Sequence, residues 1–387
     1  MEMKNKADVV IIGAGVHGLA TAFNLAKKGV KNIVVCEHKY IGYGATGKCA
    51  AGVREQYGLP LTIELAKNSM DITVHFKELY GYDIEYAPGG YLWLLYDKKD
   101  LELWRKNVAL QNSLGVKSTL LSVEEIKERY PYVNLEGVLA ATMNPRDGYV
   151  DPFKVLYAYK EMCEKEGVEI NSYTTVTDIK KKNGKIIAVV TEKGEIETNI
   201  VVSCAGSFSR KVGKMVGLDL PVRPQRHEML VTEPIEVFFP CMVITGPWYA
   251  FQDKSHGSVL MGITFPDEPL LDDVTTLQPP SSWRFLEEVL RVVVKIMPIL
   301  KDVSVVRQWG GYYDMSPDGQ QIIGSVPEVP GFYLSCGWSG HGFQMSHIMG
   351  RLLAELIVDG KTSIDINKSD LGRFERGELI PEPGIIG

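Results

Sequence analysis

The sequence lacks the features that mark membrane-spanning, secreted and nucleic-acid-binding proteins. No apolar run reaches the roughly 18 residues that a membrane helix needs. The nearest approach, 289–300, contains Arg291, Lys295 and Pro298. The net charge of −6 at pH 7 gives no support for nucleic-acid binding, and residues 1–6 do not resemble a signal peptide. We therefore expect a cytoplasmic protein with no transmembrane segment and no nucleic-acid partner.

Closely spaced cysteines are absent as well. None of the six cysteines forms a C-x-x-C pair, and cysteine and histidine show no metal-ligand spacing, so we expect no metal site. Cys36, Cys204 and Cys336 lie in apolar or glycine-rich segments, which predicts buried and reduced thiols.

Repeats and low-complexity tracts are also missing, and the composition is that of an ordinary globular protein. Apolar residues make up 45% of the chain and charged residues 23%. A chain of 387 residues is too long for one ordinary core, so we expect two domains.

The most informative feature that is present is a dinucleotide-binding fingerprint near the N-terminus. An apolar run, expected to be a buried strand, ends at Gly13, Gly15 and Gly18 in G-x-G-x-x-G spacing, and an amphipathic helix follows over 19–29. Gly13 makes the tight turn, Gly15 lets a pyrophosphate approach the backbone, and Gly18 lets helix and strand pack closely. A second apolar strand ends in Glu37, which can accept hydrogen bonds from the ribose hydroxyls.

After the fingerprint, the chain alternates between segments that resemble parts of a dinucleotide-binding domain and segments in which helix and strand signals are mixed. Helices are expected near 61–80, 100–114, 122–130, 153–166 and 344–358. Strands are expected near 90–96, 176–181, 185–191, 195–198, 200–206, 228–232, 249–253, 259–264 and 331–336.

The fingerprint occurs once, which favours FAD as the dinucleotide. A flavoprotein that also binds NAD(P)H usually carries a second G-x-G-x-x-G, and none is found here. The expected fold is α/β, with a discontinuous, doubly wound Rossmann-type FAD-binding domain and a mixed α+β substrate-binding domain. The boundaries place 1–80, 151–220 and 311–387 in the first domain and 81–150 and 221–310 in the second.

Several motifs together resemble those of the D-amino-acid oxidase superfamily of FAD enzymes, and the similarity spans nearly the whole chain. Within it, the chain looks most like the sarcosine oxidase β and archaeal dye-linked L-proline dehydrogenase β-subunit branch. The motifs are 13–18, 44–47, 53–58, 203–207, 317–318, 337–343 and 373–378.

The resemblance implies oxidation of a secondary amine next to a carboxylate, with L-proline first among the substrates. Hydride transfer would run from Cα to flavin N5, and electrons would pass to an acceptor other than oxygen. Two alternatives stay open: a sarcosine- or glycine-type oxidase that produces hydrogen peroxide, and a flavin-carrying electron-transfer subunit of a hetero-oligomer. A homo- or hetero-oligomer with a second subunit is expected.

Four residues are candidates for the chemistry. Arg54 matches the carboxylate-binding arginine of the family, and its alternative is a surface salt bridge to a nearby glutamate. His227 either orients substrate or flavin, or belongs to an exposed charged run. Tyr249 lies in an aromatic stretch that either walls a dry pocket or fills a core. Gln344 stands where relatives carry a substrate-binding lysine.

The fingerprint and the resemblance also assign positions to the cofactor. His341 is expected to contact the flavin or its phosphate through its backbone N–H, and the alternative is a histidine that serves only the geometry of the turn. Val176 is expected to meet the adenine through its main chain. The full set is Gly13, Ala14, Gly15, Val16, His17, Gly18, Glu37, His38, Lys39, Gly44, Ala45, Thr46, Ala51, Gly52, Val176, Cys204, Ala205, Gly206, Gly311, Tyr312, Gly340, His341, Gly342, Phe343 and Gln344.

Three departures from the family pattern refine these expectations. Gly311 stands where monomeric sarcosine oxidases attach FAD to a cysteine, so FAD should be non-covalent. The oxygen-activating lysine of those oxidases aligns near Leu260, which favours a dehydrogenase. Some relatives hold an FMN at a subunit interface, covalently through a histidine near 148–152; no histidine occurs there, so any FMN would be non-covalent.

Overall fold

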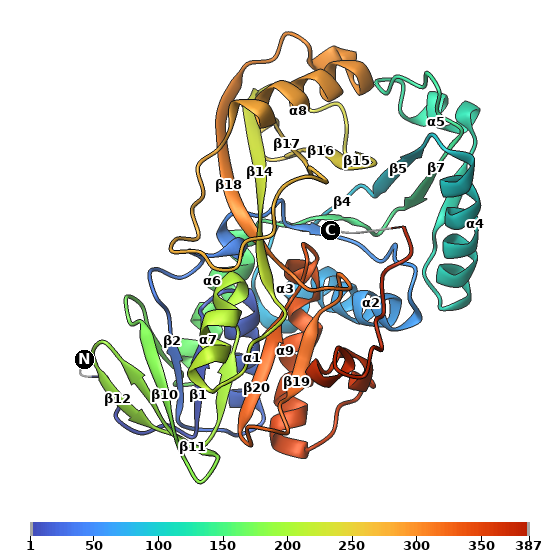
Figure 1. The fold of residues 1–387 in the computed structure, drawn as a ribbon. Coiled ribbons are helices and arrows are strands. Elements are labelled where there is room, and N and C mark those ends of the chain that lie inside the picture. The colour runs from blue at the N-terminus through green and yellow to red at the C-terminus, as the bar shows by residue number, and fades with distance from the viewer. Residues whose placement is uncertain (1–2, 385–387) are drawn as a thin grey trace.

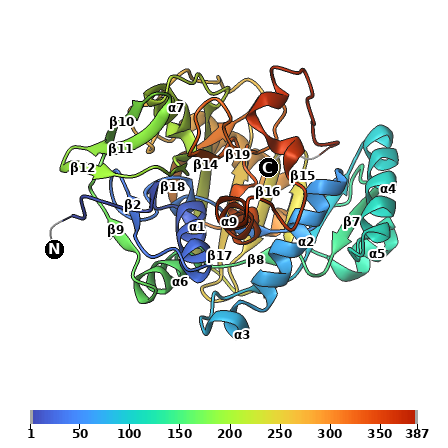
Figure 2. The same cartoon turned by 90° about the horizontal axis from the view of Figure 1, so that it is seen from below.

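The computed structural model describes residues 3–384, so residues 1–2 and 385–387 of the predicted FAD-binding segments lie outside it (Figures 1 and 2). One of the two large sheets contains the fingerprint strand at its centre. Its six strands follow the order β19 (Ile322–Ser325), β20 (Phe332–Cys336), β13 (Val201–Ser203), β1 (Val9–Ile12), β2 (Ile33–Cys36) and β9 (Glu169–Asn171). Only β19 is antiparallel to its neighbour. The chain therefore winds outward from β1 in both directions, as predicted.

This sheet is buried on both faces, which explains the continuous apolar runs of its strands. In β1, Val9 and Ile11 face one hydrophobic cluster, and Val10 and Ile12 face another. The first cluster lies under the helices α1 (Val16–Lys27), α2 (Pro60–Val74), α6 (Pro152–Lys165) and α9 (Gly342–Asp359).

The second face is covered by a separate antiparallel sheet. Its strands are β10 (Val176–Lys182), β11 (Lys185–Thr191) and β12 (Gly194–Glu197), and α7 (Ser209–Met215) packs beside them. Asn183 and Gly184 form the turn between β10 and β11, and both have positive φ (52° and 77°), as a type I′ turn requires. These three strands pair with one another rather than extending the parallel sheet.

The second large sheet has eight strands and forms the upper part of Figure 1. Its order is β18 (Val305–Met315), β14 (Arg223–Pro234), β17 (Ser258–Ile263), β16 (Trp248–Gln252), β15 (Met242–Thr245), β5 (Tyr91–Leu95), β7 (Ala140–Asn144) and β6 (Thr119–Leu121). Three helices pack against it: α4 (Lys98–Ser113), α5 (Val123–Arg129) and α8 (Trp283–Ile296).

Two features connect the large sheets. β14 and β18 form a long antiparallel pair, and β18 runs across the predicted domain boundary at 311. A small sheet joins β3 (Gly52–Val53), β8 (Gly148–Tyr149) and β4 (Ala87–Pro88). The first cavity described below lies beside the β1–α1 turn, and the second is lined by β3, β5 and β16.

Local signals in the sequence set several helix ends. Ser122 and Glu125 form a capping box at the start of α5. The Asp151 side chain accepts hydrogen bonds from the first turn of α6, and Pro152 occupies its first position. The predicted helix over 61–80 is instead two helices, α2 and α3 (Phe76–Tyr80), because the backbone leaves helical geometry at His75.

Two composition-based expectations can be compared with the structure. Cys36, Cys204 and Cys336 are buried free thiols, as predicted. Within residues 3–384, none of the helices combines the length and the apolar character that crossing a lipid bilayer requires.

Candidate functional site

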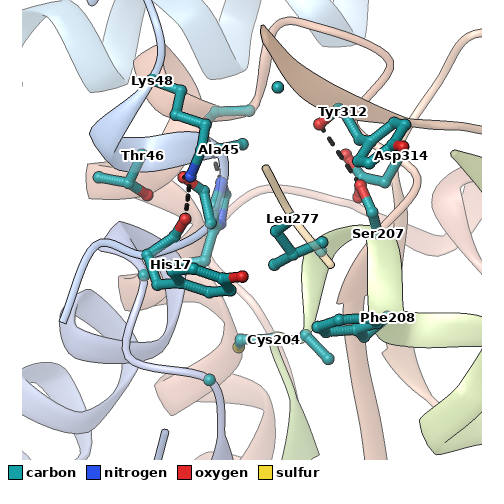
Figure 3. Close-up of a pocket in the computed structure, with 18 of the residues that line it drawn as sticks. His17, Ala45, Thr46, Lys48, Cys204, Ser207, Phe208, Leu277, Tyr312 and Asp314 are labelled. Carbon is teal, nitrogen blue, oxygen red and sulfur yellow. Dashed lines mark hydrogen bonds between the residues drawn. The ribbon is translucent and has the colours of Figure 1, made fainter. Parts of the chain in front are cut away.

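A cavity of about 270 Å³ lies beside the β1–α1 turn, and most of the predicted cofactor residues line it. Figure 3 shows His17, Thr46 and Lys48 on one side of it and Ser207, Tyr312 and Asp314 on the other. We call it the cofactor cavity. The predicted residues that line it are Gly13, Gly15, Val16, His17, Glu37, His38, Gly44, Ala45, Thr46, Val176, Cys204, Ala205, Gly206, Gly311, Tyr312, Gly340, Gly342 and Phe343.

The three fingerprint glycines have distinct steric roles. Gly13 has φ +107°, which disfavours any other residue, and a Cβ on Gly18 would lie 2.0 Å from the carbonyl oxygen of Gly13. Gly18 therefore serves the packing of α1 on β1 and does not line the cavity. A Cβ on Gly15 would meet only Thr46 Oγ1, at 3.2 Å, so the backbone at Gly15 is open to a ligand.

Glu37 lies at the end of β2 with its carboxylate held in place by two backbone groups. The N–H of Ala14 donates to Oε2 and the N–H of Lys39 donates to Oε1, each at 2.9 Å. Each carboxylate oxygen can accept a further hydrogen bond, and Glu37 lines the cavity, so the carboxylate is placed to accept from a ribose hydroxyl. Ala14 and Lys39 do not line the cavity themselves; they orient Glu37.

The other end of the cofactor cavity is formed by the start of α9. The His17 ring stacks on Trp338, with ring centroids 4.3 Å apart, and its Nε2 lies 2.8 Å from the carbonyl oxygen of Gly342. Trp338 Nε1 is a buried donor without a hydrogen-bond partner among the described residues. The open backbone at Gly15, the acid at Glu37 and this free donor together fit a dinucleotide with a polar ring system.

A second cavity, of about 350 Å³, shares walls with the first, and we call it the substrate cavity. The shared wall consists of Cys49, Ala50, His227, Tyr249, Tyr313, Gly340 and Phe343. Ala51, Gly52 and Gln344, which were predicted to bind the cofactor, line this second cavity instead.

Arg54 is buried in the substrate cavity, not exposed in a surface salt bridge. Its guanidinium carbon lies 4.6, 5.2 and 5.9 Å from the ring centroids of Tyr57, Trp93 and Tyr91. Its Nε and Nη2 are buried and have no hydrogen-bond partner among the described residues. A buried guanidinium held by aromatic faces but lacking an acceptor is suited to bind an anionic group of a ligand.

His227 and Tyr249 lie together on the wall between the two cavities. The His227 ring stacks on Tyr313 with centroids 3.6 Å apart, and burial lowers its pKa to about 3, so the imidazole is neutral. Burial also raises the pKa of Tyr249 well above its usual value, so the phenol stays protonated. Tyr249 lies flat across Gly262, its register partner on β17, where a Cβ would come within 2.5 Å of the hydroxyl.

Two residues named from the sequence lie away from the positions expected for them. The His341 N–H donates to the carbonyl oxygen of Trp338 within the turn, and its buried ring contacts Gln321 Oε1 at 3.2 Å. It is therefore not free to meet a ligand through its N–H, and it lines neither cavity. Leu260 also lines neither cavity; it packs, together with Tyr249, against the hydrophobic cluster that contains Phe251.

Other residues of the site were not identified from the sequence. Lys48 lines the cofactor cavity, where burial lowers its pKa to about 8. Asp314 also lines it and accepts from the N–H of Gly337 at 2.7 Å, and burial raises its pKa to about 6. Tyr91 and Trp93 are the aromatic partners of Arg54; their i, i+2 spacing on one strand was the available signal, because such residues face the same way.

Comparisons with known proteins agree with this geometry. Residues 8–356 match the profile of the family described as FAD dependent oxidoreductase (DAO). Sarcosine oxidase subunit beta of Rhodobacter capsulatus is 26% identical over 100% of this chain and 93% of its own.

Solved structures give the same result. The crystal structure of L-proline dehydrogenase from P. horikoshii superposes with a TM-score of 0.92 and 34% identity, covering 98% of this chain and 100% of that one. Glycine oxidase from Geobacillus kaustophilus, at 23% identity, shares the fold with a TM-score of 0.86 over 96% and 99% of the two chains. The chain therefore belongs to the FAD-dependent oxidoreductase family.

Proposed function

We propose that this protein oxidises a secondary amino acid, with L-proline as the first candidate, and passes the electrons to an acceptor other than oxygen. The observation that carries the proposal is the buried Arg54 guanidinium, which has Nε and Nη2 without partners and faces a cavity continuous with the cofactor cavity. Support also comes from the similarity to the L-proline dehydrogenase of P. horikoshii.

The cofactor cavity would hold FAD without a covalent bond. Gly15 offers its open backbone to the pyrophosphate, Glu37 offers its carboxylate to the ribose, and Trp338 Nε1 offers a donor near the start of α9. Gly311, opposite His227 in the sheet register, has no side chain that could form a covalent link. When bound, the flavin supplies the two-electron acceptor that an amine oxidation requires.

Arg54 would bind the carboxylate of the substrate. A guanidinium presents two parallel N–H donors that match a carboxylate, and such charge-assisted bonds contribute roughly 1.5–3 kcal/mol each. The guanidinium carbon lies over the rings of Tyr57 and Trp93, and Nε and Nη2 stay without a partner among the described residues. This fixes one end of the substrate and leaves its amine and Cα toward the wall shared with the cofactor cavity.

The substrate cavity favours the neutral form of the amine. Among the described residues that line it, Arg54 is the only charged side chain, and no carboxylate is present to stabilise an ammonium group. Neutral His227 and Tyr249 can exchange hydrogen bonds with an amine without adding charge. The lining is mainly apolar and aromatic, and low polarity disfavours the ammonium form.

Several further points are part of the same proposal. The similarity to a protein named L-proline dehydrogenase supports an acceptor other than oxygen. The relatives named subunit beta support assembly with a second subunit. A non-covalent FMN at the junction and a cytoplasmic location belong to the same proposal and rest on the sequence alone.

The test is anaerobic mixing of the flavin-loaded protein with L-proline, D-proline, hydroxyproline, sarcosine and glycine, following loss of the oxidised-flavin absorbance. Bleaching fastest with L-proline, and slow return of the colour in air, would support the proposal. Fast return of the colour with peroxide would support the oxidase alternative. Absence of bleaching by every amino acid would favour an electron-transfer subunit.

A further inference from the structure

The C-terminal segment, coloured red in Figure 1, runs from the lower half of the molecule past α2 toward α4. Its beginning is fixed by a buried ion pair, because Arg373 in η5 (Leu371–Arg373) donates to both oxygens of Asp318 at 2.9 Å. The N–H of Ile380 donates to the same carboxylate at 3.2 Å. We call residues 379–384 the C-terminal strap.

Glu382 makes the main polar contact of this strap. Its Oε1 accepts from the N–H groups of Gly58 and Leu59, and its Oε2 accepts from Gln320 Nε2 at 3.0 Å. These two N–H groups immediately precede α2, whose N-cap, Leu59, has no capping side chain of its own. The first N–H groups of a helix need an acceptor and favour negative charge. Glu382 therefore holds the backbone that leads into α2, from more than 300 residues away.

The strap and α4 together hold the segment that leads into α2. The carbonyl oxygen of Pro383 accepts from Asn107 Nδ2 at 3.2 Å, so the strap also contacts α4. From the same helix, Gln111 Nε2 donates to the carbonyl oxygen of Tyr57 at 2.7 Å. A Cβ on Gly58 would lie 3.0 Å from the Pro383 oxygen, so the two backbones are in close contact.

Tyr57 connects this arrangement to the substrate cavity. Its ring centroid lies 4.6 Å from the guanidinium carbon of Arg54, the shortest of the three aromatic contacts of that group. Tyr57 directly precedes Gly58, so a shift of the backbone at Gly58 and Leu59 displaces the ring. The guanidinium then loses the face that sets its orientation.

We propose that Glu382 is a positioning residue for substrate binding, which acts by holding Gly58 and Leu59 so that Tyr57 keeps Arg54 oriented toward the substrate carboxylate. The inference rests on the proposed function, because it assumes that Arg54 binds a carboxylate. It makes the C-terminal strap a determinant of substrate affinity, although the strap lines neither cavity.

The experiment compares the wild type with Glu382→Ala, Glu382→Gln and Arg54→Ala in the flavin-loaded full chain. The dissociation constant of pyrrole-2-carboxylate, which cannot be oxidised at Cα, is measured from the change in the flavin spectrum, along with kcat and KM for L-proline. Glu378→Ala is the matched control, because the Glu378 side chain is exposed and forms a surface ion pair with Arg376.

We expect Glu382→Ala to weaken pyrrole-2-carboxylate binding about tenfold, equivalent to about 1.4 kcal/mol, and to raise KM similarly. The kcat and the FAD content should stay close to those of the wild type. Glu382→Gln should restore most of the affinity, since its amide oxygen can still accept from Gly58 and Leu59. Glu378→Ala should behave as the wild type.

Two results would overturn the inference while leaving the proposed function intact. One is weaker binding in Arg54→Ala with unchanged binding in Glu382→Ala. The other is a loss of kcat or FAD in Glu382→Ala with no change in the dissociation constant, which would mean that the contact of Glu382 with Gly58 and Leu59 serves folding alone. Unchanged binding in Arg54→Ala would instead contradict the proposed function. If Glu382→Ala does not fold, Asn107→Ser removes the Pro383 contact instead, and unchanged affinity there counts against the inference.

Discussion

The backbone N–H of Arg54 donates a hydrogen bond to Gln344 Oε1 at 3.0 Å, across 290 residues of sequence. Arg54 directly follows β3 and Gln344 lies in the first turn of α9, so this bond ties the candidate carboxylate site to the helix whose start lines both cavities. Gln344 therefore fixes the Arg54 backbone, while Tyr57 contacts the Arg54 side chain.

This relationship predicts a specific effect of Gln344→Ala. The change leaves the buried N–H of Arg54 without an acceptor, which costs roughly 1–3 kcal/mol. We expect a higher KM for L-proline, with FAD content unchanged. Steady-state kinetics with an artificial electron acceptor measures this KM. Gln278→Ala, which changes an exposed glutamine, is the control. An unchanged KM would mean that Gln344 has no part in orienting Arg54.

The fingerprint glycines predict two different kinds of failure. Gly15→Ala adds a methyl group that meets only Thr46 Oγ1 in the protein, so the chain should fold but bind FAD weakly. Gly18→Ala places a methyl group 2.0 Å from the Gly13 oxygen, so folding itself should suffer. Circular dichroism measures the folding of both variants, and FAD titration measures their affinity for the cofactor. Normal FAD affinity in Gly15→Ala would contradict the location of the pyrophosphate.

Buried histidines predict a loss of stability in acid. Burial lowers the pKa of His17 to about 4 and those of His227, His341 and His347 to about 3, whereas an unfolded histidine titrates near 6.5. Below pH 6.5 the unfolded chain therefore binds more protons. Each histidine then costs roughly 1.4 kcal/mol of stability per pH unit until its folded pKa is reached.

The acid effect can be tested at one residue. His347 lies within α9 and shares a 2.8 Å hydrogen bond with the Tyr159 hydroxyl. His347→Gln keeps a polar partner and removes one titrating group. Urea unfolding between pH 7 and pH 4.5 should show a shallower dependence of stability on pH in the variant. An unchanged slope would show that His347 does not resist protonation in the fold.

The Asp318–Arg373 pair should be a major contributor to the stability of the C-terminal segment. Both side chains are fully buried, so Asp318→Ala leaves an unpaired cation and should cost about 3–5 kcal/mol. The exposed pair of Arg376 and Glu378 should contribute about 0–1 kcal/mol. Thermal and urea unfolding of Asp318→Ala and Glu378→Ala measure how much stability each ion pair contributes. Similar losses in the two variants would be contrary to this account.

Most residues that the sequence assigned to the cofactor line one cavity, because the signals that identified them are local. The turn at Gly13 to Gly18 and the acid at Glu37 lie within one β-α-β unit, so their spacing alone determines their geometry. Turns and helix caps are likewise determined by residues that are close together in the sequence. The Asn183-Gly184 hairpin and the Ser122 capping box each depend on neighbouring residues only.

The substrate cavity was predicted less completely because it depends on pairing between distant strands. Tyr91 and Trp93 reach Arg54 from β5, which pairs with β15 some 150 residues later, and no local pattern specifies that partner. β7 and β18 were missed for a related reason. Ala140, Gly310 and Gly311 have weak strand propensity, and neighbouring strands hold them in the sheet.

His341 shows the limit of motif reasoning. A histidine between two glycines at a helix start was expected to offer its N–H to the flavin. Within the turn, the His341 N–H donates to the carbonyl oxygen of Trp338, and the His341 ring contacts Gln321 in the core. The free donor is the Trp338 indole three residues earlier, an assignment that needs the three-dimensional path of the turn.

The central claim is that Arg54 binds the carboxylate of the substrate. The most direct measurement is the rate of anaerobic flavin bleaching by L-proline and by pyrrolidine, the same ring without the carboxylate, in the wild type and in Arg54→Ala. The account predicts that the wild type favours L-proline by roughly 100-fold, as expected for charge-assisted hydrogen bonds, and that this preference largely disappears in Arg54→Ala. An equal preference in both proteins would contradict it.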